Sequence, residues 1–532
     1  MANIAPGTAR GMRDLLPADM RRQLYVCGVL TEVFEAFGFE PLSTPAIERA
    51  ETLLGKYGPD AERLIYRASL GREQSLALRY DHTVSTARVA ATYDALPRPF
   101  KRYQIGPVWR GERPQRGRFR EFTQADVDII GEASVLADAE IVAIVITALD
   151  RLGFPASLTK LNNRKLLNGI GRFAGVPDAQ LAGLYRAIDK LDKIGMDGVR
   201  RELRSVGLPG DLLNRERQAV DRWLRGTADR ARLREDLGLA QDAAGAPIGA
   251  NPGIEAFLDA LADFPEGAGT TPALLERASA VALDASIAVL RQLAPRDDLV
   301  PDGVTERLLE LLQLSGAPRP LLDALGARLD DPGAREGIAE LVRVMDALDA
   351  AGIDPERYAV DFAMVRGLDY YTGTIFETLV EEPPIGSITG GGRYDTLIGL
   401  FGTDLPAVGS SFGIDRLVDV MDTLDLFPAS LAQPTTRVLV ALFDDATAMA
   451  SVEAASRLRR AGIPTELAFR AEGIGEQIRT ALKREIPVLV ILGPDEIAAG
   501  QATLRDLRRR VQRSVPLDDL VEVTQAILSE AE

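Results

Sequence analysis

The stretch from Phe100 to Gly131, FKRYQIGPVWRGERPQRGRFREFTQADVDIIG, decides the fold of this chain. Its two ends are rich in aromatic and β-branched residues, and the middle holds Pro114 and Gly117. Such runs favour strands, while proline and glycine mark the connection between them. The stretch therefore predicts a hairpin of two strands joined by a basic loop.

The second strand and the loop carry the polar groups of this hairpin. A period of two places Gln124, Asp126 and Asp128 on one face of the strand and small or apolar residues on the other. Between Arg98 and Arg120 lie eight basic residues and one acid, Glu112. The hairpin is predicted to bind anions. A basic surface hairpin with a solvated polar face is the alternative that these residues leave open.

Length and composition restrict the class of protein. A chain of 532 residues is too long for one ordinary core, so two to four domains are expected. It is 46% hydrophobic and 26% charged, and no apolar run approaches the roughly 20 residues of a membrane span. The N-terminus has no apolar export segment, and a single cysteine, Cys27, excludes an internal disulfide. A cytoplasmic protein with no membrane association is expected.

Charge and histidine content restrict the chemistry. The formal net charge of −16 argues against indiscriminate coating of nucleic acid, although a local basic patch can still bind RNA. His82 is the only histidine, which argues strongly against a histidine general base, a Ser-His-Asp triad or a histidine-rich metal site. We interpret His82 as incidental to function. Arginines, carboxylates and bound ions must carry any reaction.

Six features of the sequence resemble a known family. The string FKRYQIGPVWRGERPQRGRFREF resembles motif 2 of class II aminoacyl-tRNA synthetases in its histidyl form. RGLDYYTG, from Arg366, and GGGRYD, from Gly390, match peptides typical of histidyl-tRNA synthetases. AVGSSFGIDRLVDVM, from Ala407, resembles motif 3, and the predicted helix 19–37 with the strand that follows resembles motif 1. The form RYD-x-T around Asp81 is similar to the eukaryote-type branch.

The resemblance implies an α/β (α+β) fold with several domains. Residues 1–154 and 353–430 are expected to form the antiparallel catalytic core of a class II synthetase. Residues 155–352 show helical spacing without a chemical motif, and are expected to form a mostly helical insertion. From Arg437 strands and helices alternate, so residues 435–532 are expected to form an α/β anticodon-binding domain.

The resemblance also implies roles for individual residues. Arginine suits phosphate because its forked donors match the phosphate oxygens, and because, unlike lysine, it does not lose its charge in the site. The implied catalytic residues are Arg110 and Arg366, and those for ATP are Arg110, Glu112 and Arg416. The implied residues for histidine are Asp81, Thr83, Gln124, Asp128, Arg366, Tyr370, Tyr371 and Tyr394. Gln115 and Arg118 would lie near the tRNA acceptor end. Mg²⁺ would be held mainly by phosphates and water, without a protein metal site.

Taken alone, each of these residues also has a plain structural interpretation. Thr83 can cap a helix. Tyr370 and Tyr371 can pack in a sheet, where adjacent side chains cannot both face one pocket. Three consecutive glycines at 390–392 can form a turn. Arg416 can pair with an acid on a helix surface.

The implied function is that of a histidine–tRNA ligase. Its substrates would be L-histidine, ATP and tRNA(His), and a homodimer is expected by family analogy. Two rivals remain at this point. One is a non-catalytic histidine-binding regulatory paralogue, against which Arg366 and the region after Arg437 argue. The other is a class II synthetase for another amino acid, such as proline or threonine, against which RGLDYYTG and GGGRYD argue.

Overall fold

The structure is a computed structural model of the chain. It describes residues 6–55, 62–70, 74–114, 117–154, 157–188, 191–206, 210–238, 252–269, 271–293, 303–312, 314–365, 370–380, 382–383 and 385–530. The chain forms two compact units, Met1–Leu16 with Gln23–Leu426 and Pro17–Arg22 with Phe427–Glu532. No helix within the described ranges has both the length and the apolarity needed to cross a bilayer.

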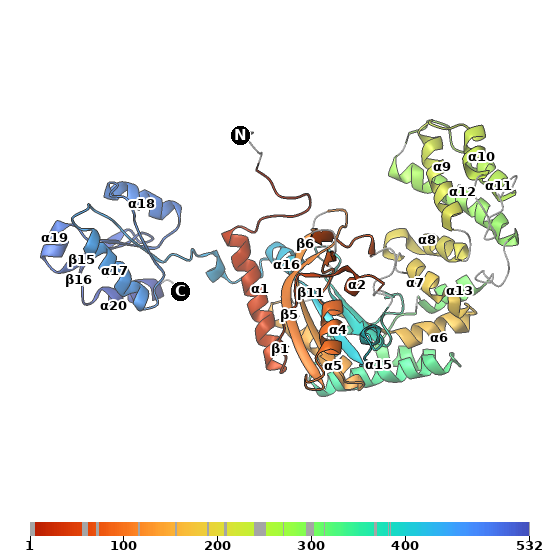
Figure 1. Ribbon diagram of the computed structural model, residues 1–532, viewed down its shortest axis with the longest axis horizontal. Helices are drawn as coiled ribbons and strands as arrows, with labels where there is room; N and C mark the ends of the chain where they lie inside the picture. The colour runs from red at the N-terminus through yellow and green to blue at the C-terminus, as the bar shows by residue number, and fades with distance from the viewer. Residues whose placement is uncertain are drawn as a thin grey trace. The chain divides into compact units, whose positions relative to one another are not determined.

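The first unit is built on an eight-stranded sheet in the order β1–β5–β6–β11–β10–β9–β7–β8 (Figure 1). The strands are β1 Glu40–Pro41, β5 Phe100–Trp109, β6 Glu121–Ile130, β7 Leu158–Asn163, β8 Tyr358–Val360, β9 Thr374–Leu379, β10 Ser387–Arg393 and β11 Ala407–Gly413. The β1–β5 and β7–β8 pairs are parallel, and the other neighbours are antiparallel. The expected antiparallel core is confirmed.

The predicted hairpin forms the second and third strands of this sheet. β5 and β6 pair from Phe100 opposite Ile130 to Trp109 opposite Glu121. The apolar face of β6 is buried, and so are Gln124, Asp126 and Asp128 on the other face. The alternative of a solvated polar face is therefore wrong, because β11 and the segments around the sheet cover these side chains.

Helices and a small sheet surround the main sheet. They are α1 Pro17–Ala36, α2 Ala50–Leu53, α4 Thr83–Thr92, α5 Val135–Arg151, α15 Pro332–Ala350 and α16 Ile414–Thr423, with β2 Ile47–Arg49, β3 Arg67–Leu70 and β4 Gln74–Leu78. α5 is apolar on almost every side, and it packs against β6, β10 and β11 on one flank and α15 on another (Figure 1). A helix enclosed in this way is buried through most of its circumference.

The described part of the insertion is helical, as expected. Its helices are α6 Arg164–Ala174, α7 Leu181–Ile188, α8 Leu191–Ser205, α9 Gly210–Leu224, α10 Arg230–Gly238, α11 Pro252–Leu261, α12 Pro272–Leu293, α13 Val304–Leu312 and α14 Pro318–Gly326. α9 to α12 gather around a core of their own that includes Trp223, Leu233 and Phe257 (Figure 1). β7, although it lies after residue 155, is hydrogen-bonded to β9 in the main sheet.

Glu216 in α9 gives this insertion a pH-dependent stability. Its carboxyl group is buried and accepts a hydrogen bond from the Ser286 hydroxyl, and its Oε2 has no hydrogen-bond partner among the described residues. Burial raises the pKa of Glu216 to about 7. The folded chain therefore holds this proton more tightly than the unfolded chain. The contribution of Glu216 to the free energy of unfolding is complete near pH 4 and is lost as pH rises through 7.

We expect Glu216→Gln to increase the free energy of unfolding at pH 8 by about 1–3 kcal/mol, because no charge is then buried. At pH 5 the change should be much smaller. Urea unfolding of the full chain at the two pH values measures the difference. An equal gain at both would contradict a buried, titrating carboxyl group.

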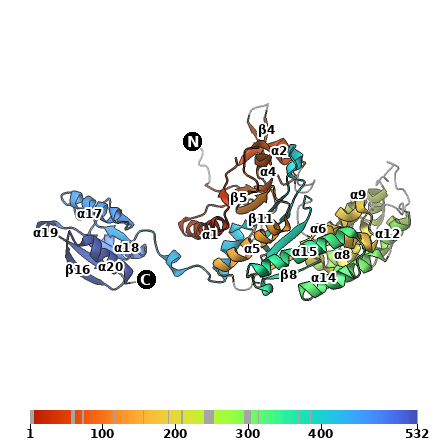
Figure 2. The ribbon, with the colours of Figure 1, turned by 90° about the horizontal axis from the view of Figure 1, so that it is seen from below.

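The second unit is a small α/β domain with the sheet order β13–β12–β14–β15–β16. Its elements are β12 Val438–Val440, α17 Ala448–Arg460, β13 Thr465–Leu467, α18 Ile474–Lys483, β14 Val488–Ile491, α19 Pro494–Ala498, β15 Gln501–Asp506, β16 Val511–Pro516 and α20 Leu520–Ser529. Figure 2 shows its helices grouped around the strands. Sequence analysis did not predict β16, whose residues VQRSVP are mostly exposed and do not alternate between apolar and polar side chains.

Candidate active site

One cavity in the first unit, of about 330 Å³, collects the predicted site residues. It is lined by parts of β6, β9, β10 and β11, by the hairpin loop and by the starts of α4 and α16. The predicted residues in its lining are Asp81, Thr83, Arg110, Glu112, Arg118, Gln124, Asp128, Tyr370, Tyr371, Tyr394 and Arg416. Two further predicted residues, Gln115 and Arg366, lie outside the described residues.

Asp128 lies at the centre of the buried polar face. The register of the sheet puts it between Arg102 on β5 and Gly409 on β11. A Cβ atom at Gly409 would stand 1.9 Å from Asp128 Oδ1, so only glycine leaves room for the carboxylate. Arg102, with an exposed fraction of 0%, forms an ion pair with Asp128, and the Tyr394 hydroxyl donates to it. Burial nevertheless raises the pKa of Asp128 to about 6.

A second set of hydrogen bonds joins β6 to β11 beside Asp128. Gln124 Nε2 donates to Ser411 Oγ at 2.7 Å, and this hydroxyl donates to Asp126 Oδ1 at 2.6 Å. Gln124 Oε1 is buried without a hydrogen-bond partner among the described residues. Such an acceptor calls for a donor from a bound molecule. Asp126 and Ser411 also line the cavity. The period-two pattern placed Asp126 on this face, but sequence analysis did not assign it to the site.

Three tyrosine side chains form an aromatic wall of the cavity. The ring centroids of Tyr370 and Tyr371 are 5.0 Å apart, and those of Tyr370 and Tyr394 are 5.9 Å apart. The expectation that Tyr370 and Tyr371 cannot both face one pocket was wrong. Both residues lie before the start of β9, so the alternation of side chains along an extended strand does not apply to them. Both line the cavity.

The three glycines at 390–392 lie within β10, so the turn alternative is wrong. A Cβ atom at Gly392 would stand 2.9 Å from Tyr371 Cδ1, and one at Gly391 would stand 2.1 Å from the carbonyl oxygen of Gly409. Glycine at these positions lets the tyrosine ring and the neighbouring strand approach β10.

Asp81 and Thr83 enter the cavity where α4 begins. Thr83 does not cap the helix; Asp81 Oδ1 instead accepts the backbone N–H of Val84 at 3.2 Å. His82 between them is a buried core residue whose Nε2 lies 3.2 Å from the carbonyl oxygen of Gly106. Burial lowers the pKa of His82 to about 3, so its ring is neutral at physiological pH.

The arginines approach the cavity from two different elements. The Arg110 guanidinium, directly after β5, lies 4.4 Å from the ring centroid of Tyr80 and 5.2 Å from that of Phe122, and its Nε donates to the Tyr80 carbonyl at 3.2 Å. Arg416 is in the first turn of α16 and donates to the carbonyl oxygens of Ser387 and Gly117. The cavity thus has an acidic part and a cationic part.

Arg13 links the N-terminal segment to the hairpin loop and to the start of α16. Its Nη2 is 2.7 Å from Asp415 Oδ1, and its guanidinium lies 3.8 Å from the ring centroid of Phe119 in the hairpin loop. Asp415 Oδ2 also accepts the backbone N–H of Thr123 at 2.8 Å. This link was not predicted, because Arg13 lies in a segment without periodicity.

No group of three or more histidine, cysteine or acidic side chains in the described ranges is arranged to hold a metal ion. Two glutamates, Glu112 and Glu377, line the same cavity as Arg110 and Arg416. A cation carried in by phosphates needs only one or two such carboxylates. The donors present therefore fit Mg²⁺ bound together with a nucleotide.

Models of known protein families match both units of the chain. The model described as histidyl-tRNA synthetase matches residues 11–246 and 256–417, and the model described as anticodon binding domain matches residues 437–527. The first match spans the catalytic core and much of the insertion.

Individual relatives are similar to this chain over almost its full length. The chain is 38% identical to a histidine–tRNA ligase of Gloeobacter violaceus, with 96% of each chain covered. It is 35% identical to a histidine–tRNA ligase of Aeropyrum pernix, with 99% of this chain and 100% of the other covered. A solved histidyl-tRNA synthetase from a Nostoc species superposes with a TM-score of 0.68 at 26% identity, covering 98% of this chain and 100% of the other. These matches show that the chain belongs to the histidyl-tRNA synthetase family.

Proposed function

We propose that this chain activates L-histidine with ATP, giving histidyl-adenylate and pyrophosphate, and then transfers histidine to the 3′ end of tRNA(His). The observation that carries the proposal is that buried acids and an amide line the same cavity as Arg110 and Arg416. Such a cavity offers hydrogen-bond acceptors to an amino acid and positive charge to a nucleotide.

In the first step the histidine carboxylate attacks the α-phosphorus and pyrophosphate leaves. This step needs alignment of the reactants and stabilisation of developing negative charge, and it needs no general base. Arg110, fixed between two aromatic rings, is assigned to the α-phosphate, and Arg416 to the far phosphates. Arg366 keeps the role at the α-phosphate and substrate that the sequence resemblance implies.

Histidine would be recognised by the acidic part of the cavity. Gln124 and Asp128, with Tyr371 and Tyr394, are assigned to the imidazole ring. Asp81 and Thr83 are assigned to the amino group, and Tyr370 closes the wall beside them. Buried groups that must hydrogen-bond the substrate reject analogues without the matching groups by large factors, since they would be left unpaired.

Mg²⁺ would be held through Glu112 and Glu377 together with phosphate oxygens. When bound, the ion offsets the negative charge of the phosphates.

The tRNA would contact both units. Gln115 and Arg118, which follow β5 in the sequence, are assigned to its acceptor end. In the structure, Arg118 Nη1 lies 3.6 Å from Glu112 Oε2. The proposed division is a catalytic core of residues 1–154 and 353–430, an insertion of residues 155–352, of which β7 belongs to the main sheet, and an anticodon-binding domain of residues 435–532. A homodimer in the cytoplasm is also part of the proposal.

ATP–pyrophosphate exchange with purified protein tests the function. Histidine should support exchange, while proline, threonine and no amino acid should not. Histidine binding without exchange would favour the regulatory paralogue, and exchange with another amino acid would favour another class II synthetase. The superposition on a Bacillus halodurans structure titled as an ATP phosphoribosyltransferase regulatory subunit/histidyl-tRNA synthetase, with a TM-score of 0.62 at 19% identity, shows shared fold alone.

An exposed ring in the second unit gives a prediction for the tRNA. Phe469 follows the end of β13 with an exposed fraction of 87%, and Phe443 follows the end of the parallel strand β12. Exposed rings of this kind stack on nucleic-acid bases for about 1–3 kcal/mol each. Phe469→Ala should raise KM for tRNA by about 10–100-fold in aminoacylation and leave histidine-dependent exchange unchanged. Met449→Ala, an equally simple truncation of an exposed side chain on α17, is the control.

A further inference from the structure

We propose that Arg393 is a positioning residue for histidine recognition, acting through Asp138, Asp395 and Thr372. This inference rests on the proposed function. Arg393 is the last residue of β10, and it is followed directly by Tyr394. Thr372 directly follows Tyr371. The network therefore joins the two segments that carry these tyrosines of the cavity.

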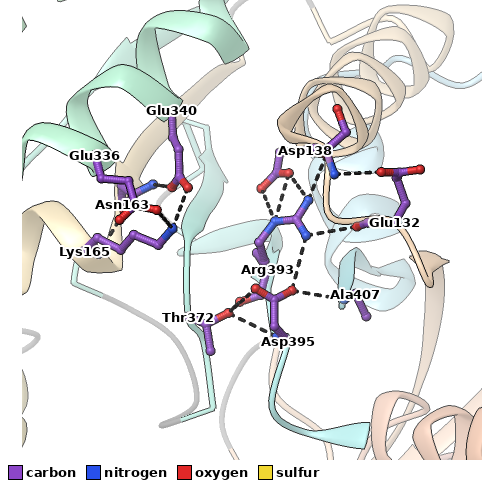
Figure 3. Close-up of polar contacts among 11 residues, drawn as sticks. Glu132, Asp138, Asn163, Lys165, Glu336, Glu340, Thr372, Arg393, Asp395 and Ala407 are labelled. Atoms are coloured by element: carbon purple, nitrogen blue, oxygen red, sulfur yellow. Dashed lines mark hydrogen bonds and ion pairs between the residues drawn. The ribbon is translucent and has the colours of Figure 1, made fainter. Parts of the chain in front are cut away.

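All five N–H groups of the buried Arg393 guanidinium have acceptors (Figure 3). Nε donates to Asp138 at 3.1 Å, and Nη2 donates to Asp138 and to the Ser134 carbonyl at 3.0 Å. Nη1 donates to the Glu132 carbonyl at 3.1 Å and to Asp395 Oδ1 at 3.2 Å. A guanidinium held at every donor has a single orientation, which lysine with its point charge cannot reproduce.

The Arg393 side chain crosses the first turn of α5. Ser134 is the N-cap of this helix and Asp138 is in its first turn. A positive charge beside a helix N-terminus is unfavourable, because it faces the positive end of the helix dipole. The Asp138 carboxylate, which is also buried, offsets both charges. The ion pair with Asp138 therefore allows Arg393 to lie beside the N-terminus of α5, where an arginine without a counter-ion would be unfavourable.

The network extends from Arg393 to the segment after Tyr371 through Asp395. Thr372 Oγ1 donates to Asp395 Oδ2 at 3.1 Å, and the Thr372 N–H donates to the Arg393 carbonyl at 2.8 Å. A Cβ atom at Gly373 would stand 3.0 Å from Arg393 Cδ, so glycine lets this segment lie on the arginine stem. Asp395 Oδ1 also accepts the N–H of Ala407 in β11, at 3.2 Å.

This geometry leads to the tyrosines of the cavity. Tyr394 is fixed on one side by Arg393 and on the other by Asp395, and its own N–H donates to the Ala407 carbonyl at 2.7 Å. Its hydroxyl reaches Asp128. Tyr371 lies one residue before Thr372 and packs on Gly392. Loosening the network should therefore move the groups that meet histidine, while Arg110 and Arg416 keep their own supports.

The test uses Thr372→Val, which keeps the shape of the side chain and removes its hydroxyl. Wild-type protein is first measured in histidine-dependent exchange; absence of exchange there would reject the proposed function, not the network. With an active wild type, Thr372→Val should raise KM for histidine by about tenfold and change KM for ATP and kcat by less than about threefold. Asp395→Asn should act in the same direction.

The matched control is the second network in Figure 3. Lys165 at the start of α6 binds Glu336 and Glu340 of α15 at 2.7 and 2.6 Å, and it does not line the cavity. Lys165→Met breaks this network and should lower Tm without raising KM for histidine. The inference is overturned if Thr372→Val and Asp395→Asn leave KM for histidine unchanged, or if Lys165→Met raises it equally.

Discussion

Arg110→Gln is expected to lower kcat of histidine-dependent ATP–pyrophosphate exchange by about 10²–10³-fold. The reason is that the guanidinium is fixed before the substrate arrives: Tyr80 and Phe122 flank it, and one of its five donors is used by the Tyr80 carbonyl. Charge that is already oriented stabilises the transition state without reorganisation. Single-turnover adenylate formation measures the effect directly.

Two variants make this result specific. Arg110→Lys keeps the charge and loses the planar fork, so its activity should lie between wild type and Arg110→Gln. Arg98→Gln changes an arginine at the opposite end of β5, which donates to the Ala90 carbonyl at 3.0 Å, and should keep its exchange activity. Equal losses in Arg98→Gln and Arg110→Gln would show that the effect is on the fold of the hairpin.

Arg102→Met is expected to lower the free energy of unfolding by about 3–5 kcal/mol, because Asp128 would then be buried without its counter-ion. Urea unfolding measures the loss. Histidine activation should fall as well, since an unpaired buried carboxyl group takes up a proton and no longer accepts as an anion.

The double variant Arg102→Met with Asp128→Asn separates stability from recognition. It removes the unpaired Asp128 charge, so it should recover part of the stability that Arg102→Met loses, while Asp126 stays buried. It should remain inactive with histidine, because the acceptor assigned to the imidazole is gone. A double variant less stable than Arg102→Met would contradict the ion pair as the cause.

The elements that sequence analysis predicted best depend on local patterns. Period-two alternation places Gln124, Asp126 and Asp128 on one face of β6, which extends from Glu121 to Ile130. The alternation of strands and helices after Arg437 likewise gives the second unit. These patterns arise from residues a few positions apart, which a linear sequence displays.

The contacts that position the site join residues far apart in the chain. Arg393 and Asp138 are separated by 255 positions, and Arg13 and Asp415 by 402. No period or spacing connects such pairs, and each partner taken alone resembles a surface charge. The exposure of Tyr370 and Tyr371 to one cavity was missed for a related reason, since it depends on where β9 begins.

The strand order has a consequence for how the chain is made. β6 lies between β5 and β11 in the sheet, but β11 begins only at Ala407, after the whole insertion. During synthesis from the N-terminus, at about 5–20 residues per second, the hairpin would wait on the order of tens of seconds for this neighbour. Until then one edge of β6 has no partner and its acids have no cover, while the insertion can already assemble around its own local core. The pocket is thus completed late in synthesis, and until then the unpaired edge of the nascent hairpin is open to pairing with other chains.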